Sequence, residues 1–533
     1  MKLNRLLSLV SLCSVLGTLQ AQTSYEASSL LDTDLCGTAR YIGMGGAMSA
    51  LGTDMSTMST NPAGTALNRS WDIAFSLGGN WATQHAQSNM GSMRAFSSYA
   101  SLDNAGIVVT TEVSDDRALR FVNFGFNYRN IKRFGDKMSM ETHLGGLSQT
   151  GQMARQVWDN RALPELGIEG ITPSYFDAGN PKSFYNENYY SSPWVGWLTL
   201  LGADARLVDA TAFNEGGYPY AAESGSYRES LHGGINACDF NISLNLLDAI
   251  YLGVTFTTYD VDRAFESVYS ERLVDAGYTL TNYYRTMGTG YDFKFGAIVR
   301  PFSESSFRVG LSASTPTVYT LRDWNSAIID SEFTQRDANG AAVETVFHGI
   351  NTWDEVAYGR DYVTDYTMMS PAKFNVSLGG TVARSLALGA EYEYMDYSKI
   401  RLYESDGTEN VAMNEHTSDI FTGRHTLRLG VEKVFGSFYT RAGYNYQTGG
   451  YKRDAWKMIP VNSVQTNTAY TNLRSTNSYT CGIGYRGDVY YIDAAMLYSV
   501  QSADFYAFDD LELKATSLSR NLIKGTVTIG MRF

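Results

Sequence analysis

Hydrophobic and polar positions alternate along much of the chain, most clearly at its end. In residues 520–533 the apolar side chains of Ile523, Val527, Ile529 and Phe533 fall on one face, and mostly polar side chains fall between them. A period of two is typical of a β-strand with one apolar and one polar face. The same alternation recurs upstream, in residues 384–404, 437–453 and 489–506.

A pass along the whole chain predicts fourteen such strands, an even number, as a single-chain bacterial barrel requires. The predicted strands are 71–82, 93–111, 119–146, 227–245, 250–269, 281–300, 306–322, 360–381, 385–404, 421–434, 437–453, 475–485, 489–506 and 520–533. The register of 93–111 is the poorest among them. The pattern predicts an all-β fold, a transmembrane antiparallel β-barrel of about 14 strands.

The predicted connections alternate in length, which also favours a barrel. Short turns are expected at 112–118, 246–249, 301–305, 382–384, 435–436 and 486–488. The connections at 83–92, 147–226, 270–280, 323–359, 405–420, 454–474 and 507–519 are mostly longer. Outer-membrane barrels place short turns in the periplasm and long loops outside.

Charged side chains occur on the faces that would point inward, which separates a barrel from a soluble sandwich. Glu391 and Glu393 share such a face, and unpaired carboxylates are too costly for a packed sandwich core. The inward charges of both signs are Asp292, Lys294, Arg308, Lys373, Glu391, Glu393, Arg428, Glu432, Arg441, Asp493 and Lys524. We expect them to pair with one another and with a plug, although Lys294, Arg308, Arg428 or Arg441 could instead meet a ligand carboxylate.

The N-terminus has the layout of an export signal. Lys2 and Arg5 precede a largely apolar run, and a cleavage site follows Ala21, so residues 1–21 are predicted to be a signal peptide. No later apolar run is long enough for a membrane-spanning helix. Residues 22–70 would then be a plug, and 71–533 the barrel, with a long insertion at 147–226. Three cysteines remain, Cys36, Cys238 and Cys481, and we expect free thiols.

Composition limits the possible functions of this 533-residue chain. A net charge of −13 argues against nucleic acid as a partner. The six histidines show neither a catalytic triad spacing nor a metal-binding pair, so we expect no enzyme, no metal and no cofactor. They are His85, His143, His232, His348, His416 and His425.

The insertion 147–226 is the longest predicted connection. It contains a helix-like stretch at 153–163 and an apolar stretch at 194–203. A segment of this length is often a functional lid. A rigid cap that shields the mouth or meets lipopolysaccharide remains the alternative.

A glycine-rich segment, residues 37–67, lies before the first strand. Gly43, Gly45 and Gly46 allow close backbone approach, and Asn61-Pro62-Ala63 suits a turn or a helix start. These six residues could gate a movable plug or only hold a compact one in place.

Several stretches resemble the FadL-type outer-membrane family, which carries long-chain fatty acids and other hydrophobic compounds. They are Gly37-Thr38-Ala39-Arg40, Gly43-Met44-Gly45-Gly46-Ala47, Asn61-Pro62-Ala63-Gly64, Ser314-Thr315-Pro316-Thr317, and the strands from Pro371 to Tyr397-Ser398-Lys399. The resemblance implies a barrel with an N-terminal hatch in its lumen, placed in the outer membrane of a Gram-negative bacterium. It also implies passive uptake of a hydrophobic ligand, capture at the outer loops and a hatch that gates the path.

In this family the path leads sideways through a gap at the third strand. Gly125, which has no side chain on the inward face, is the candidate for the weak point here, and the alternative is a glycine that makes room for the hatch. Expected partners are a hydrophobic small molecule, outer-membrane lipid, lipopolysaccharide and the barrel-assembly machinery, with a monomeric barrel. Some family members are labelled haemin receptors, but no two histidines are fixed as axial ligands. The alternative function is a non-transporting partner in surface assembly or secretion built on the same barrel.

Overall fold

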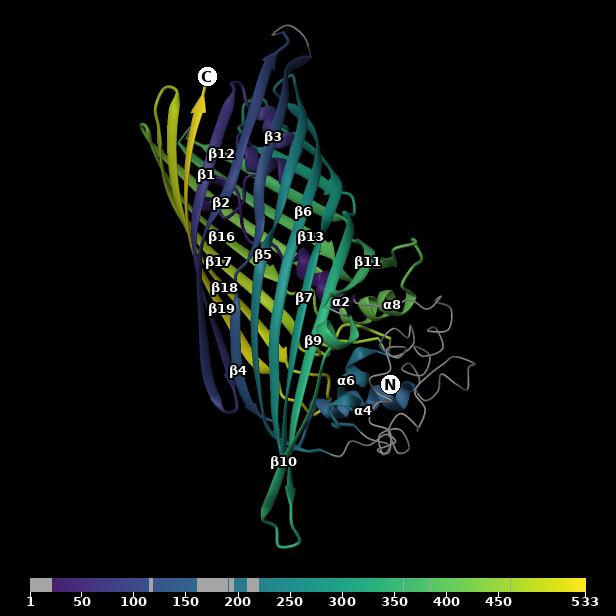
Figure 1. The fold of residues 1–533 in the computed structure, drawn as a ribbon. Helices are drawn as coiled ribbons and strands as arrows, with labels where there is room; N and C mark the ends of the chain where they lie inside the picture. Colours follow the sequence, from purple (N-terminus) through teal and green to yellow (C-terminus); the bar gives the residue numbers. More distant parts are fainter. Residues whose placement is uncertain are drawn as a thin grey trace.

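The computed structural model describes residues 22–114, 118–160, 190, 196–208, 220–357, 359–383, 385–460 and 462–533. The predicted signal peptide and part of the 147–226 insertion lie outside these residues. The described chain forms one antiparallel barrel with helical segments inside it and at one end (Figure 1).

The barrel wall has fourteen strands, as predicted. One sheet contains nineteen strand segments, because β3–β4, β8–β9, β10–β11–β12 and β13–β14 each continue one wall strand across a break, and pairing of β1 with β19 closes the sheet. The segments are β1 Asp72–Ser88, β2 Gly91–Glu112, β3 Leu119–Phe134, β4 Lys137–His143, β5 Ala222–Leu246, β6 Ile250–Leu273, β7 Ala276–Val299, β8 Arg308–Ser314, β9 Val318–Arg336, β10 Ala342–Asn351, β11 Tyr362–Met369, β12 Lys373–Val382, β13 Leu386–Asp396, β14 Arg401–Glu404, β15 Gly423–Phe435, β16 Phe438–Thr448, β17 Tyr470–Arg486, β18 Tyr490–Tyr506 and β19 Thr516–Arg532.

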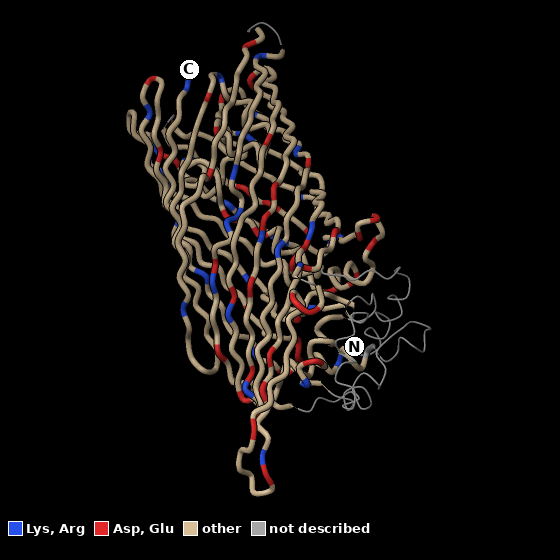
Figure 2. Tube along the Cα trace, viewed as in Figure 1, with Lys and Arg blue, Asp and Glu red and all other residues tan. Residues whose placement is uncertain are grey.

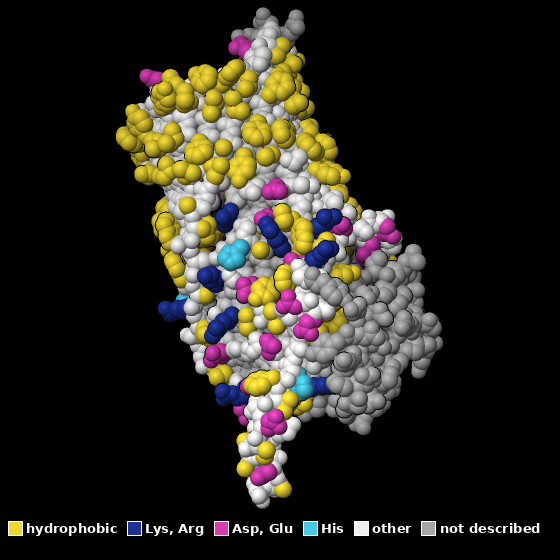
Figure 3. Space-filling model, viewed as in Figure 1, with side chains coloured by type: hydrophobic (Ala, Val, Ile, Leu, Met, Phe, Trp, Pro, Cys, Tyr) yellow, Lys and Arg dark blue, Asp and Glu magenta, His cyan; other side chains and the backbone are white. Residues whose placement is uncertain are grey.

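An apolar belt surrounds the part of the barrel near the short turns. Figure 3 shows hydrophobic side chains gathered at this end and charged side chains mixed in farther away. Charged positions nevertheless occur along the strands at the height of the belt, where they point inward (Figure 2). The predicted faces of the last strand are confirmed, since Ile529 is 58% exposed and Thr528 is fully buried.

Three of the predicted loops are wrong in part, because the strands continue into them. β1 and β2 extend to a tight turn at 89–90, in the predicted loop 83–92, and β6 and β7 extend likewise through 270–280. Within 323–359, β9 and β10 form a hairpin that projects beyond the barrel (Figure 1). Outside the belt, the outward face meets water instead of lipid, so the hydrophobic period is lost although the backbone ladder continues.

The hatch fills the lumen at the height of the belt. Its helical segments are α2 Ser24–Leu31, α3 Ala39–Gly43, η2 Met55–Ser59 and η3 Pro62–Leu67. Ile42 and Met48 are fully buried between the hatch and the wall. A plug inside the lumen, as predicted, is therefore present.

Helices from the long loops cover the other end of the lumen. α4 Gln149–Asn160 and α6 Trp197–Asp204 overlap the two helical or apolar stretches predicted in the insertion. Met153, Trp197 and Leu201 of these helices are buried in one apolar cluster with wall residues such as Tyr269 and Phe505. The described part of the insertion therefore caps the mouth. A third helix, α8 Val411–Ile420, lies beside α2 (Figure 1).

No helix among the described residues is long and apolar enough to cross a membrane.

The contact between α2 and α8 contains a buried histidine. The Nδ1 atom of His416 lies 3.2 Å from Ser24 Oγ, and its ring packs edge-on against Trp456 at 4.8 Å. Burial lowers the pKa of His416 from 6.5 to about 4, because the protonated ring loses its hydration.

We expect acid to weaken this contact. The undocked histidine takes up a proton near pH 6.5 and the docked one only near pH 4. The contribution of His416 to the free energy of docking is therefore complete above pH 6.5 and falls by about 3 kcal/mol as the pH is lowered towards 4. Hydrogen exchange protection of the amides of α2, corrected for the intrinsic pH effect, measures the loss. His416→Gln should remove most of this pH dependence, and an unchanged dependence would contradict the assignment to His416.

Candidate functional site

The hatch lies against a row of glycines in the wall. Gly389, Gly430 and Gly443 are direct neighbours across β13, β15 and β16, and all three face the lumen. A Cβ atom at Gly430 would lie 2.5 Å from Met44 O, and one at Gly443 would lie 2.2 Å from Gly45 N. Hatch backbone and wall backbone therefore meet directly, which side chains at these wall positions would prevent.

The predicted hatch glycines take part in the same contact. Gly45 and Gly46 have φ angles of +62° and +81°, a left-handed backbone that favours glycine. A Cβ atom at Gly45 would lie 2.8 Å from Tyr444 N, and one at Gly46 would lie 3.1 Å from Cδ of Arg428. Gly43, at the end of α3, is less constrained, since its nearest wall atoms would be 3.4 Å from a Cβ.

Asn61-Pro62-Ala63 docks on the opposite part of the wall. The side chain of Asn61 caps η3 by accepting a hydrogen bond from Ala63 N at 3.1 Å, and its amide donates to Ala297 O at 3.4 Å. Gly296 makes room for this group, because a Cβ atom there would lie 2.1 Å from Asn61 Oδ1. The contacts are those of a docking and capping motif. Movement of this motif upon ligand binding stays a prediction.

An ion-pair network joins the hatch to the wall beside the glycine row. Arg40 of α3 binds both oxygens of Glu432, at 3.0 and 2.9 Å, and Arg441 donates to the same carboxylate at 2.6 Å. Arg441 also contacts Asp493 at 2.6 Å, and Asp493 in turn pairs with Arg486. The carboxylate of Glu432 thus compensates two guanidinium groups that burial has removed from water.

The four lumen cations predicted as candidates for a ligand carboxylate all have protein partners. Lys294 pairs with Asp292 at 2.5 Å, Arg308 donates to a hatch carbonyl, Leu51 O, at 3.1 Å, and Arg428 pairs with Glu391 and Glu393. Arg441 belongs to the network just described. The expectation that inward charges pair with each other and with the hatch is therefore met at these positions.

A second set of ion pairs holds the linker between α2 and α3. Asp32 lies 3.2 Å from Lys132 of β3 and 3.2 Å from Arg424 of β15, and Asp34 lies 3.3 Å from Lys132 and 3.7 Å from Arg520 of β19. Three cations from three distant wall strands thus converge on two hatch carboxylates. This arrangement fixes the part of the hatch that faces the long-loop end.

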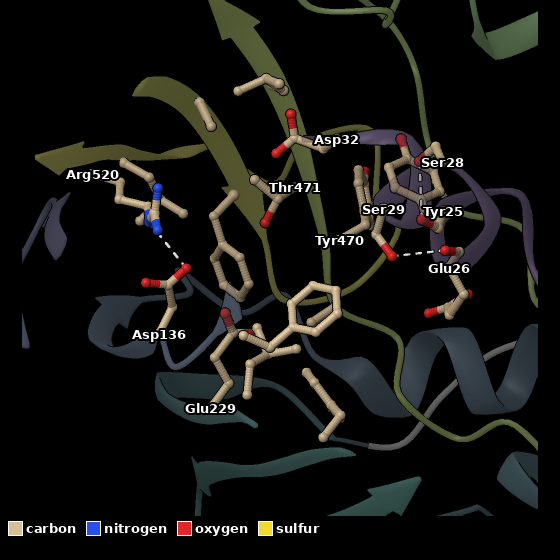
Figure 4. Close-up of a pocket in the computed structure, with 18 of the residues that line it drawn as sticks. Tyr25, Glu26, Ser28, Ser29, Asp32, Asp136, Glu229, Tyr470, Thr471 and Arg520 are labelled. Carbon is tan, nitrogen blue, oxygen red and sulfur yellow. Dashed lines mark hydrogen bonds and ion pairs between the residues drawn. The ribbon is translucent and has the colours of Figure 1, made fainter. Parts of the chain in front are cut away.

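A cavity of about 220 Å³ lies between α2, the linker that follows it and the wall strands on the long-loop side of the hatch. Figure 4 shows Tyr25, Glu26 and Asp32 of the hatch facing wall residues across it, with Arg520 paired to Asp136. Aromatic rings form much of its lining, from the hatch, from the strands and from the loop before β17. The cavity is therefore aromatic and charged, and suits a ligand with a flat body and a polar group better than a long alkyl chain.

The wall beside the cavity contains a seam. β2 pairs with β3 only from Asn104 to Glu112, whereas residues 91–103 pair with β1 alone and residues 130–143 pair with β5 alone. A bulge at Asp103, where the β1–β2 register shifts, accounts for the poor register predicted for this strand. At its far end the seam is closed by Asn89, whose amide donates to His143 O at 2.9 Å.

The seam adjoins both the cavity and the apolar belt. Lys132, Phe134 and Asp136 lie along it and also line the cavity. The end of the seam nearer the short turns, at Leu102 and Asn104, reaches the exposed hydrophobic side chains of the belt. Among the described residues, no backbone ladder joins the two strands between the cavity and the belt.

Gly125, the candidate for the weak point, lies in a part of β3 that is paired on both sides, with Val108 and with Asn241. A Cβ atom there would lie 2.2 Å from Cε of the hatch residue Met58, so this glycine makes room for the hatch. A role in lateral opening stays a prediction. The pairing of β3 with β2 ends farther along the strand, after Arg129, and Gly135-Asp136 separates β3 from β4.

Comparison with known proteins finds matches among solved structures. No family model matches the sequence, and no curated protein matches it. Similar structures include a Pseudomonas aeruginosa FadL homologue (11% identity, TM-score 0.49) and the toluene transporters TodX of Pseudomonas putida (10%, 0.44) and TbuX of Ralstonia pickettii (12%, 0.43), each over 94% of this chain and 99% of the other. One of these solved structures is described as a FadL homologue, of the family that the N-terminal motif resembles.

Proposed function

We propose that the protein is a passive outer-membrane channel for hydrophobic molecules, which enter at the long-loop end, bind in the cavity and leave sideways through the seam. The observation that carries this proposal is the position of the seam. The seam borders both the aromatic cavity, on the long-loop side of the hatch, and the apolar belt. The hatch blocks the straight path through the lumen.

The barrel itself supports the location and the class of substrate. A closed barrel with an outward apolar belt is the form in which outer-membrane proteins cross the lipid. The free energy of a hydrophobic solute falls when it moves from the cavity into lipid, so uptake requires no energy source. Fatty acids remain one possible substrate, and gating by Asn61-Pro62-Ala63 remains part of the proposal.

A disulfide across the seam tests the route. A Cβ atom at Gly135 would lie 3.9 Å from Cγ of Tyr99, so cysteines at these two positions are close enough to be joined with a small backbone adjustment. In the Tyr99→Cys/Gly135→Cys variant, oxidation should reduce uptake of radiolabelled toluene and oleate by proteoliposomes to the level of empty vesicles. Reduction of the disulfide should restore uptake.

The parent protein, oxidised in the same way, controls for its native thiols Cys36, Cys238 and Cys481. Full uptake by the oxidised variant would rule out the seam as the route but not the channel. Uptake by the parent protein no faster than by empty vesicles would rule out the channel itself.

A further inference from the structure

The cavity contains one cation whose charge the protein leaves without a partner. Four described cations line it: Lys132, Arg263, Arg424 and Arg520. Lys132 and Arg424 bind Asp32, and Arg520 binds Asp136 at 3.0 Å. Arg263, on β6, makes no ion pair with any described carboxylate within the 4.0 Å that defines one.

Arg263 is nonetheless buried. The residue is 7% exposed, and its Nε–H group has no acceptor among the described residues. Three carboxylates, those of Glu26, Glu229 and Asp323, act on it only through space; Glu26 binds Lys457 at 2.8 Å and Glu229 accepts from Tyr227 at 3.1 Å. A buried guanidinium that donates no hydrogen bond to a described carboxylate is costly, so a missing anionic partner is the simplest explanation.

The surroundings of Arg263 indicate the shape of that partner. The guanidinium carbon lies 5.2 Å from the ring centre of Tyr284, 5.8 Å from that of Phe134 and 6.0 Å from that of Phe265. Phe265 and Tyr284 are themselves stacked at 4.4 Å. Aromatic faces attract the cation but accept none of its N–H groups in the plane of the guanidinium, where a carboxylate binds.

We propose that the cavity binds an aromatic carboxylate, with its acid group on the guanidinium of Arg263 and its ring among Phe134, Phe265 and Tyr284. The inference rests on the proposed function and names a substrate class for it. Two parallel hydrogen bonds from a guanidinium suit a planar carboxylate, and a flat ring can stack where an alkyl chain would leave gaps. A neutral hydrocarbon would fill the same space but would leave the charge of Arg263 without a partner.

Binding of two probes that share one ring system tests the proposal. Calorimetry on the purified full-length barrel compares 1-naphthoate, ionised at pH 7.5, with naphthalene, its uncharged parent. Loss of a charge-assisted hydrogen-bonded pair should weaken binding of 1-naphthoate by Arg263→Gln about 10- to 100-fold. Binding of naphthalene should be unchanged, and Arg263→Lys should recover part of the loss.

Arg285→Gln is the matched control, since Arg285 lies on the neighbouring strand but is exposed and paired with Asp262. Equal affinity of the wild type and Arg263→Gln for 1-naphthoate would overturn the proposal. Failure of the wild type to bind naphthalene would count against the proposed hydrocarbon channel, whereas a selective loss of 1-naphthoate in Arg263→Gln would still support this site.

The wild-type protein provides a second measurement in case Arg263→Gln does not fold. Phenylglyoxal modifies accessible arginines, and mass spectrometry locates the modification. We expect 1-naphthoate to protect Arg263 at a lower concentration than naphthalene does, because only the carboxylate binds the guanidinium. Bound 1-naphthoate that leaves Arg263 fully reactive would refute the proposed contact.

Discussion

Replacing Gly430 by leucine should open the barrel to polar solutes. A Cβ atom at this position would lie 2.5 Å from the carbonyl oxygen of Met44 and 3.2 Å from its carbonyl carbon, so the clash is with hatch backbone that has no room to move locally. Overpacking of this kind costs about 1–3 kcal/mol. The wall is held by continuous ladders to β13 and β16, so the hatch is the part that gives way.

The expected shift in the ratio of undocked to docked hatch is about 10- to 100-fold. Single-channel conductance in planar bilayers and swelling of liposomes in sucrose measure it. Gly525→Leu is the matched control, since Gly525 faces outward on β19 and a Cβ atom there has no neighbour closer than 3.9 Å. A Gly430→Leu barrel that folds and stays closed to sucrose would show that the glycine row does not seat the hatch.

The number of strands could be predicted because lipid imposes the period of two. Within the belt one face must be apolar, as in residues 520–533, and each strand can be recognised by itself. Outside the belt that constraint ends, which is why the extensions of β1, β2, β6 and β7 were not predicted. The position of the hatch also follows from the pattern, since polar and charged side chains that face the lumen need polar or oppositely charged groups beside them.

The contacts of the hatch could be predicted only in part. The inward direction of Glu432 and Arg441 follows from alternation within each strand. Arg40, which shares the carboxylate of Glu432 with Arg441, lies almost four hundred positions away in the sequence. The glycine row has the same difficulty, because Gly389, Gly430 and Gly443 become neighbours only once the register of three strands is known. Arg263 gave no signal, since nothing in the sequence shows that a cation lacks a partner.

The seam left a clearer trace in the sequence. Gly135 and Asp136 interrupt the pattern of the predicted strand 119–146, and a glycine within a strand often marks a bend or a break. The sequence points instead to Gly125, which lies in the membrane part of the strand and has no side chain on the inward face. The structure shows that a glycine facing the lumen at belt height accommodates the hatch, as Gly296 and Gly430 also do.

Removing the carboxylate of Glu432 should destabilise the docked hatch more than removing its hatch partner. Glu432→Gln leaves Arg40 without an anion and Arg441 with Asp493 alone, in a place where the side chain of Arg441 is fully buried. A buried pair broken from one side typically costs about 3–5 kcal/mol. Arg40→Met should cost less, since Glu432 keeps its 2.6 Å contact with Arg441.

The double variant separates the pair from its surroundings. Once Arg40 is methionine, the change Glu432→Gln no longer leaves a hatch cation without its carboxylate. The destabilisation of the double variant should therefore be about 2 kcal/mol smaller than the sum of the two single variants. Urea unfolding followed by the mobility of the folded band measures the wall, and protease cleavage within residues 32–70 measures the hatch. Additive effects, or a hatch that stays protected in Glu432→Gln, would mean that the backbone contact at the glycine row alone holds the hatch in place.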